Sequence, residues 1–91
     1  MSKAFKTFVD DYSHDGFSMS FKNGFTISVQ FSKHHRCDAG NTTAEVAIWD
    51  KDNNWYLYDE GTWYKLPQYA EVMSYQTAEQ VAHLIEIISK K

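Results

Sequence analysis

The sequence predicts an α+β fold in which an antiparallel sheet of four to five strands packs against a C-terminal helix. Residues 17–31 and 42–59 alternate apolar and polar side chains around short polar turns, which is typical of half-buried hairpin strands. Residues 77–89 instead repeat apolar side chains with helical spacing. With 91 residues, the chain is expected to form a single domain, 1–91.

Composition narrows the classes of partner. The net charge of −3 comes from twelve acidic and nine basic residues without a basic block, which argues against nucleic-acid binding. Aromatic residues make up 16% of the chain, so a few large rings can fill a small core. The single cysteine, Cys37, leaves no internal disulfide and fits a reducing compartment. We find no apolar run of membrane length and no apolar leader, so no membrane partner is expected.

A short N-terminal helix is predicted over residues 3–12. Its apolar side chains would share one face, namely Phe5, Phe8, Val9 and Tyr12. We expect it to end near Gly16, because glycine readily takes the left-handed conformation that terminates helices. A helix this short needs a surface to dock on, so it should cover part of the sheet.

The first hairpin contains Asn23-Gly24, a pair that favours a two-residue loop. That loop would place the apolar residues of the two strands on opposite faces of the sheet. A three-residue loop over 22–24 puts them on one face, through the pairs Phe21–Phe25, Met19–Ile27 and Phe17–Val29. Because burial of one face decides the register, we predict the longer loop, with Gly24 in the left-handed conformation.

The central hairpin, Thr42–Asp59, is expected to turn through a two-residue loop at Asp52-Asn53. That register pairs Trp49 with Tyr56, and Ile48 with Leu57. Because side chains alternate along a strand, it also assigns two faces. One face would carry Ala44, Val46, Ile48, Trp55 and Leu57, and the other Ala47, Trp49, Tyr56 and Tyr58.

A further hairpin is predicted around a two-residue loop at Glu60-Gly61. Its strand pairs would be Tyr58–Trp63 and Tyr56–Lys65. Pro67 has no backbone N–H to donate, so the second strand should end there. Residues 69–76 fit either a short strand or an extended approach to the last helix.

The last helix has the clearest start signal, because Thr77 and Gln80 have the spacing of a capping box. Its buried stripe is expected to comprise Ala78, Val81, Ala82, Ile85 and Ile88, widened by Leu84 and Ile87. Its solvent face should carry Glu79, His83, Glu86 and Lys90. Glu86 and Lys90 are spaced for a favourable ion pair.

The polar stretch Ser32–Asn41 holds His34, His35, Arg36, Cys37 and Asp38. Histidine, cysteine and aspartate bind metals, and a thiol beside a histidine can act as a nucleophile. A structural zinc site usually needs four ligands at recognisable spacing, which this sequence does not provide, so we predict no metal and no cofactor. Two interpretations are favoured instead: a surface loop whose Cys37 packs inward, and a recognition loop that binds a partner.

A second group of candidate partner-binding residues comprises Trp49, Tyr56, Tyr58, Trp63 and Lys65. Aromatic side chains on one face of a sheet can stack on a ligand or anchor a partner protein. Alternatively, a helix covers these rings, since large exposed apolar patches are uncommon on monomers.

Three blocks of the sequence, in their order and spacing, resemble a family of small, mostly uncharacterised proteins encoded by bacteriophages. The blocks are Asn23–Phe31, with Cys37 shortly after it, Thr43–Trp55 and Tyr75–Ile85. The chain departs from the family pattern at Asn53, where glycine is expected, and in the aromatic insertion Thr62–Tyr69.

The resemblance implies a non-enzymatic accessory protein in the cytoplasm of a bacterial host. Such a protein would bind a host protein and inhibit or redirect it, for example as an anti-defence factor. The resemblance supplies no catalytic residue. A second hypothesis is sequestration of a small molecule or nucleotide signal between aromatic rings, where a homo-oligomer interface could form the site. A third is an enzyme that uses Cys37 with His34 or His35.

Overall fold

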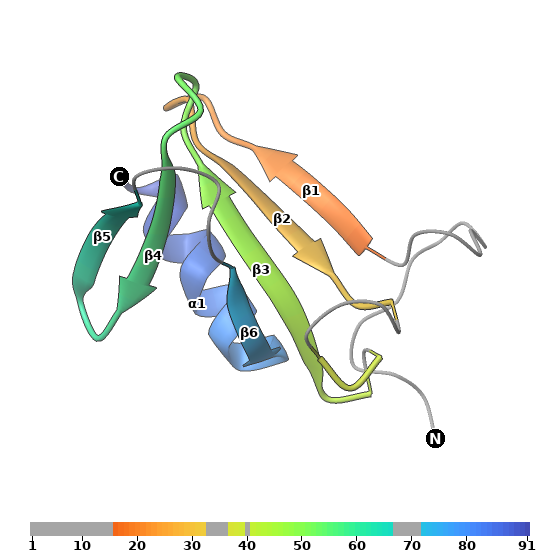
Figure 1. Ribbon diagram of the computed structural model, residues 1–91. Helices are drawn as coiled ribbons and strands as arrows, with labels where there is room; N and C mark the ends of the chain where they lie inside the picture. Colours follow the sequence, from red (N-terminus) through yellow and green to blue (C-terminus); the bar gives the residue numbers. More distant parts are fainter. Residues whose placement is uncertain (1–15, 33–36, 40, 67–71) are drawn as a thin grey trace.

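A computed structural model of the chain describes residues 16–32, 37–39, 41–66 and 72–91. These residues form one antiparallel sheet of six strands and one helix (Figure 1). The elements are β1 (Gly16–Ser20), β2 (Thr26–Gln30), β3 (Thr43–Trp49), β4 (Trp55–Asp59), β5 (Thr62–Leu66), β6 (Met73–Thr77) and α1 (Ala78–Ser89). The expected α+β fold is confirmed, with one strand more than predicted. The helix expected over residues 3–12 lies outside the described residues.

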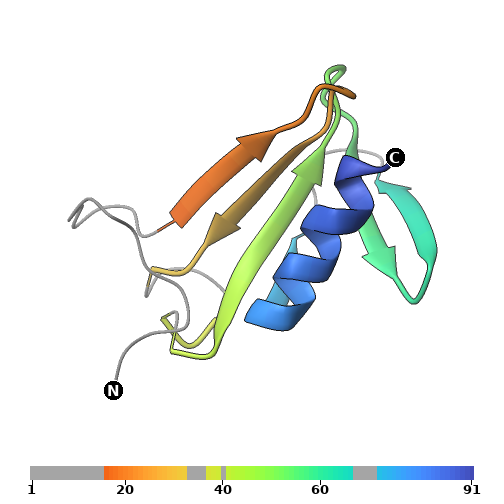
Figure 2. The same ribbon diagram turned by 180° about the vertical axis from the view of Figure 1, so that it is seen from behind.

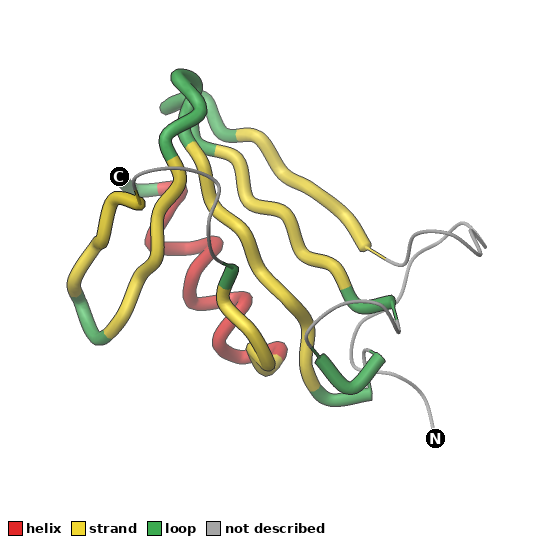
Figure 3. The backbone as a smooth tube through the Cα atoms, viewed as in Figure 1, coloured by secondary structure: helices red, strands yellow, loops and turns green. Residues whose placement is uncertain are grey.

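Strand β3 is the centre of the sheet. Its one side pairs with β2 along most of its length, and its other side is divided between two strands. Val46 and the residues before it pair with β6, whereas Ile48 and Trp49 pair with β4. The sheet therefore splits beyond β3 into two arms, β6 and the β4–β5 hairpin (Figure 3).

Helix α1 packs on one face of the sheet, along β3 (Figure 2). The buried core of the described residues comprises Ile27, Val29, Phe31, Ala44, Val46, Ile48, Met73, Val81, Leu84 and Ile88. Thr77 and Gln80 form the predicted capping box, so the start of the helix is confirmed. Ala82, which was expected in the buried stripe, is exposed. The stripe is centred on Val81, Leu84 and Ile88, and Ala82 lies beside it, turned about 100° from Val81.

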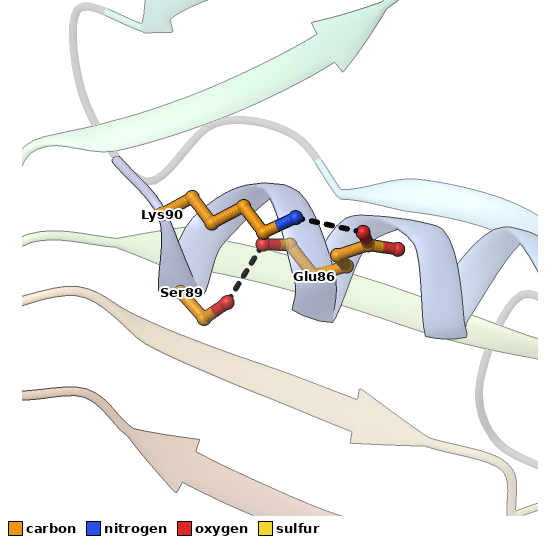
Figure 4. A network of polar contacts seen from close by, with 3 residues as sticks. All are labelled: Glu86, Ser89 and Lys90. Carbon is orange, nitrogen blue, oxygen red and sulfur yellow. Dashed lines mark hydrogen bonds and ion pairs between the residues drawn. The ribbon is translucent and has the colours of Figure 1, made fainter.

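The solvent face of α1 agrees with the prediction. Lys90 Nζ lies 2.9 Å from Glu86 Oε1, and Ser89 Oγ donates to the Glu86 carbonyl at 2.7 Å (Figure 4). Both charged side chains are exposed, so the ion pair adds little to stability.

The β1–β2 loop makes a tertiary contact, because its Asn23 side chain reaches the last turn of α1. Asn23 Nδ2 donates to the Ile88 carbonyl at 2.7 Å, and Asn23 Oδ1 accepts from the Phe25 N–H at 3.1 Å. Carbonyls in the last turn of a helix have no partner within the helix. Asn23 therefore caps the C-terminal end of α1 from a loop far away in the sequence.

The β1–β2 hairpin has the predicted register. Phe17 lies opposite Val29 and Met19 opposite Ile27, and Gly24 has a φ of 93° in a three-residue loop. Phe17 and Met19 share the face that α1 covers elsewhere, yet they are 37% and 39% exposed. Among the described residues, the covered part of the sheet thus ends at β2.

The central hairpin corrects the prediction. Ile48 lies opposite Tyr56 and Trp49 opposite Trp55, so the register differs by one residue from the expected pairing. The loop has three residues, 51–53, and Asn53 has a φ of 62°. Because a shift of one residue turns every side chain of a strand over, the faces predicted for β4 are exchanged. Tyr56 and Tyr58 lie on the α1 side with Ile48, and Trp55 and Leu57 lie on the opposite side.

The Asp50 carboxylate explains why the longer loop forms. It accepts hydrogen bonds from the N–H groups of Asp52 and Asn54, each at 2.9 Å, and from the Tyr56 hydroxyl at 2.8 Å. Partial desolvation raises the pKa of Asp50, but these hydrogen bonds outweigh it and lower the pKa to about 2. Desolvation, together with the Asp50 charge, raises the pKa of Tyr56.

The β4–β5 hairpin forms as predicted, and β6 is the short strand that was one of two alternatives for this part of the chain. Glu60 and Gly61 form a two-residue loop with positive φ values, 46° and 88°, and the predicted β4–β5 pairs are confirmed. Residues 73–77 form a strand. A bulge in β6 sets Ser74 and Tyr75 opposite a single residue of β3, and Tyr75 has a φ of 54°.

Candidate functional site

The split in the sheet opens a groove between the β4–β5 hairpin and β6, beside α1. Its volume is about 670 Å³, which is in the range of ligand-binding pockets. The hairpin contributes Leu57, Tyr58, Asp59, Glu60, Gly61 and Tyr64 to the lining. The other wall consists of Val72, Met73 and Gln76 from β6 and the residue before it, and of Gln80, His83 and Leu84 from α1.

The apolar part of the lining joins the groove to the core. Met73 and Leu84 belong to the buried core, and Leu57 and Tyr58 pack against it. Tyr58 also contacts the His83 ring, with 6.3 Å between the ring centroids. Tyr64 remains 51% exposed, so this ring has contact area left for a partner.

The polar part of the lining is acidic at the hairpin end. Asp59 and Glu60 are exposed and adjacent to the groove, and no lysine or arginine lines it among the described residues. Gln76 Nε2 donates to the Ser74 carbonyl at 3.1 Å, and Gln80 Oε1 accepts from the Thr77 N–H at 2.8 Å. The two amide groups thus keep further hydrogen-bonding capacity for a bound molecule.

The backbone of β4 also faces the groove. The Asp50 N–H donates to the Asn54 carbonyl at 3.0 Å, and pairs in an antiparallel ladder alternate, so the backbone groups of Tyr56 point toward β3. Those of Tyr58, two residues further, point to the same side. In the register continued from Ile48–Tyr56, Tyr58 would pair with Val46, but Val46 pairs with Met73. Among the described residues, the Tyr58 backbone therefore has no strand partner on that side.

The four aromatic residues proposed from the sequence do not share one face. Trp49 stacks on Trp55, with 5.2 Å between ring centroids, on the side away from α1. Tyr58 and Trp63 contact each other on the α1 side, at 4.9 Å, and Trp63 also lies 6.3 Å from the Phe25 ring. Because Ile48, and not Trp49, lies opposite Tyr56, the Trp49 side chain is on the other face of the sheet from Tyr56 and Tyr58. Only Tyr58 of the four lines the groove.

Two lysines, Lys65 and Lys91, lie near the aromatic residues on the α1 side of the hairpin. Lys65 is exposed and pairs with Tyr56 across the β4–β5 ladder. Lys91 Nζ lies 4.8 Å from the centre of the Trp63 ring and 5.4 Å from that of Phe25, which are cation–π distances. The Trp63 ring is thus in contact with Lys91, and Tyr56 is engaged through its hydroxyl, which donates to Asp50, and through the Phe25 ring.

The candidates from the polar stretch 32–41 divide into two groups. His34, His35 and Arg36 lie outside the described residues. Asp38 organises the turn before β3: its carboxylate accepts from the Thr42 hydroxyl and from the N–H groups of Thr42 and Thr43. These hydrogen bonds, with that from the Thr42 hydroxyl first, hold the pKa of Asp38 well below its usual range.

Cys37 behaves as a small apolar residue. It is half-buried, packs against the core, and its Sγ lies 3.7 Å from the Ser32 carbonyl oxygen. No group of three or more metal-binding side chains occurs within the described ranges. The sequence-based interpretation of Cys37 as an inward-packing residue agrees with this placement.

Several groove residues were not singled out from the sequence, among them Leu57, Asp59, Glu60, Tyr64, Gln76 and His83. They come from β4, the turn after it, β5, β6 and α1, and apart from the neighbours Asp59 and Glu60 they form no motif in the sequence. They come together because β6 pairs with β3 next to β4.

Comparisons with protein families, curated proteins and solved structures found no match. Within the described part of the chain, no helix combines the length and apolar character that crossing a membrane requires.

Proposed function

We propose that this chain is a non-enzymatic phage accessory protein that binds a host protein in the bacterial cytoplasm and inhibits or redirects it. The groove between the β4–β5 hairpin and β6 is the binding site in this proposal. The observation that carries it is the groove itself, which combines the exposed Tyr64 ring with a strand edge at Tyr58 that has no strand partner among the described residues. The phage origin and the anti-defence role rest on the resemblance of three sequence blocks to phage-encoded proteins.

The groove has the features of a protein-binding site. Its tyrosines offer large, fairly rigid contact surfaces, and tyrosine is enriched among the residues that dominate binding energy. Its apolar floor continues into the core through Met73 and Leu84, so a bound side chain would be supported by packed residues.

Affinity capture from host lysate tests the proposal. We expect the wild-type protein to enrich one host protein, and Tyr64→Ser to reduce its capture about thirty-fold, because aromatic anchors typically contribute 2 kcal/mol or more. Tyr75→Asn is the matched control, since Tyr75 is also an exposed tyrosine, at 61%, but does not line the groove. Recovery of no host protein, or equal loss with the control, would contradict the proposal.

A second function, sequestration of a small molecule, is favoured by the size of the groove and by its three rings, Tyr58, Tyr64 and His83. Thermal-shift measurements with nucleotides distinguish the two functions. A ligand at one hundred times its Kd stabilises the native state by about 2.7 kcal/mol, which raises the unfolding midpoint by several degrees. If a nucleotide produces this shift in the wild type but not in Tyr64→Ser, sequestration replaces protein binding as the function of the groove.

A further inference from the structure

We propose that the groove recognises its partner as an extended segment that adds as a strand antiparallel to β4 and places a basic side chain beside Asp59 and Glu60. This inference rests on the proposed function, because it takes the groove to be a protein-binding site. It goes further by naming the conformation and the charge of the segment that binds.

The ladder of the sheet leaves a place for such a strand. The β3–β4 pairing stops at Ile48–Tyr56, and the preceding part of β3, from Thr43 to Val46, pairs with β6 on the same side. The Tyr58 N–H and carbonyl, which point away from β5, therefore face the groove. An unpaired strand edge is a template for a further strand, because the added backbone satisfies its hydrogen-bonding groups.

The lining suits the alternating side chains of an extended segment. Tyr58 lies on the α1 side, where it contacts His83, whereas Leu57 and Tyr64 pair on the opposite side. The stretch Leu57–Asp59 pairs with β5 on one side and has no described strand on the groove side. It spans about 10 Å at ~3.3 Å per residue, so it accommodates about three residues of the incoming strand. Successive side chains of that strand would contact these two sides in turn.

Charge selects among extended segments. The hairpin end of the groove carries two exposed carboxylates, and the described lining offers no lysine or arginine to balance them. Each pairing of a basic side chain with an exposed carboxylate is expected to raise affinity by up to about five-fold. An acidic segment would instead be repelled at the same place.

The probe for the test is a display library of unstructured twelve-residue peptides, selected on the wild-type protein. We expect the selected peptides to carry lysine or arginine, and to share an alternating pattern of apolar residues. N-methylation of one selected peptide, residue by residue, should weaken binding more than ten-fold at the residue that pairs with Tyr58 and much less at its two neighbours, whose N–H groups would point away from β4. A scan without one such sensitive position, or enrichment of acidic peptides, would overturn the inference.

Proline variants test the strand edge on the protein side. Tyr58→Pro removes the N–H that faces the groove and should weaken peptide binding more than ten-fold, whereas Tyr58→Phe keeps the backbone and should bind nearly as wild type. Lys65→Pro is the matched control, because it removes an N–H from the outer edge of β5. If circular dichroism shows that Tyr58→Pro is unfolded, the N-methylation scan on the wild type decides alone.

The two proposals can fail separately. If no peptide is selected while capture of a host protein still depends on Tyr64, strand addition is wrong and protein binding by the groove stands. If capture and selection both fail, both proposals are wrong.

The role of the two carboxylates is tested by the double variant Asp59→Asn and Glu60→Gln. It should weaken binding of a selected basic peptide about three- to twenty-fold at low salt. An unchanged affinity would remove the basic side chain from the inference.

Discussion

The β1–β2 and β3–β4 hairpins turn through loops of the same geometry. In the first, Phe21 N–H donates to the Phe25 carbonyl at 2.8 Å, and in the second Asp50 N–H donates to the Asn54 carbonyl at 3.0 Å. The third loop residue has a positive φ in both, 93° at Gly24 and 62° at Asn53. The sequence predicted the first loop correctly and the second one residue too short.

The two loops differ in what holds them. The first is joined to the end of α1 through the Asn23 side chain, so it depends on the tertiary structure. The second is closed by its own Asp50 carboxylate, which accepts hydrogen bonds only from residues two to six positions further along. Both loops therefore have local side-chain hydrogen bonds, because Asn23 Oδ1 accepts from the Phe25 N–H at 3.1 Å, and only the first loop is held by a long-range contact with α1 as well.

The largest effect on stability is expected when alanine replaces the residue with positive φ in each loop, Gly24 in the first and Asn53 in the second. Gly24→Ala should lower the free energy of unfolding by about 1–2 kcal/mol, because a Cβ disfavours this conformation. The nearest side-chain atom is 3.5 Å from the position of that Cβ, so backbone strain and not a clash is measured. Asn53→Ala should cost less, because asparagine already bears part of this strain. If urea unfolding showed that Gly24→Ala and Asn53→Ala lose the same free energy of unfolding, this expectation would be contradicted.

The tertiary anchor of the first loop is tested by Asn23→Ala. Removing the hydrogen bond to the Ile88 carbonyl should lower the free energy of unfolding by about 1 kcal/mol. Amide hydrogen exchange should also become faster in the last turn of α1, although the substitution lies in the loop between β1 and β2. Lys22→Ala in the same loop serves as the control and should leave exchange in α1 unchanged.

The local anchor of the second loop is tested by pH. Asp50 has a pKa of about 2 in the folded protein, below the ordinary 3.8, so its charged form stabilises the fold. That contribution is present in full above about pH 4 and is lost as the pH falls toward 2. The stability difference between wild type and Asp50→Asn should therefore be constant near neutral pH and disappear over this range. Asp38, whose pKa is also lowered, is common to both proteins and cancels. A difference that persists at pH 2 would show that Asp50 acts through packing.

The smallest effect is expected for Asn53→Gly, which replaces one residue that tolerates a positive φ with another. Relief of backbone strain is offset by the greater freedom that glycine gives the unfolded chain, so stability should change by less than about 0.5 kcal/mol. Nuclear Overhauser contacts should still place Ile48 opposite Tyr56, because the Asp50 hydrogen bonds do not involve the side chain at 53. A shift to the pairing of Trp49 with Tyr56 would show that Asn53 itself sets the register.

Prediction of the fold succeeded where neighbouring residues carry the information. The capping box of Thr77 and Gln80, the turn at Glu60-Gly61 and the alternation in β2 and β3 are local patterns, and the structure confirms them. The first hairpin was assigned correctly because one face of it is clearly apolar. The central hairpin has no such face: Trp49 and Trp55 are as large and apolar as Tyr56 and Tyr58, so burial could not decide between two registers.

The amino-acid sequence by itself determined that β1 to β5 are strands, where α1 begins, and which residues of β2 and β3 are buried, because each of these depends on contacts between near neighbours. Only the tertiary structure decided that β6 and β4 share one side of β3, and hence that Tyr58, Tyr64 and His83 meet in a groove. Two strands compete there for the same edge of a third. The outcome depends on the packing of Met73 and Leu84 into a core assembled from distant parts of the chain, which no local pattern records.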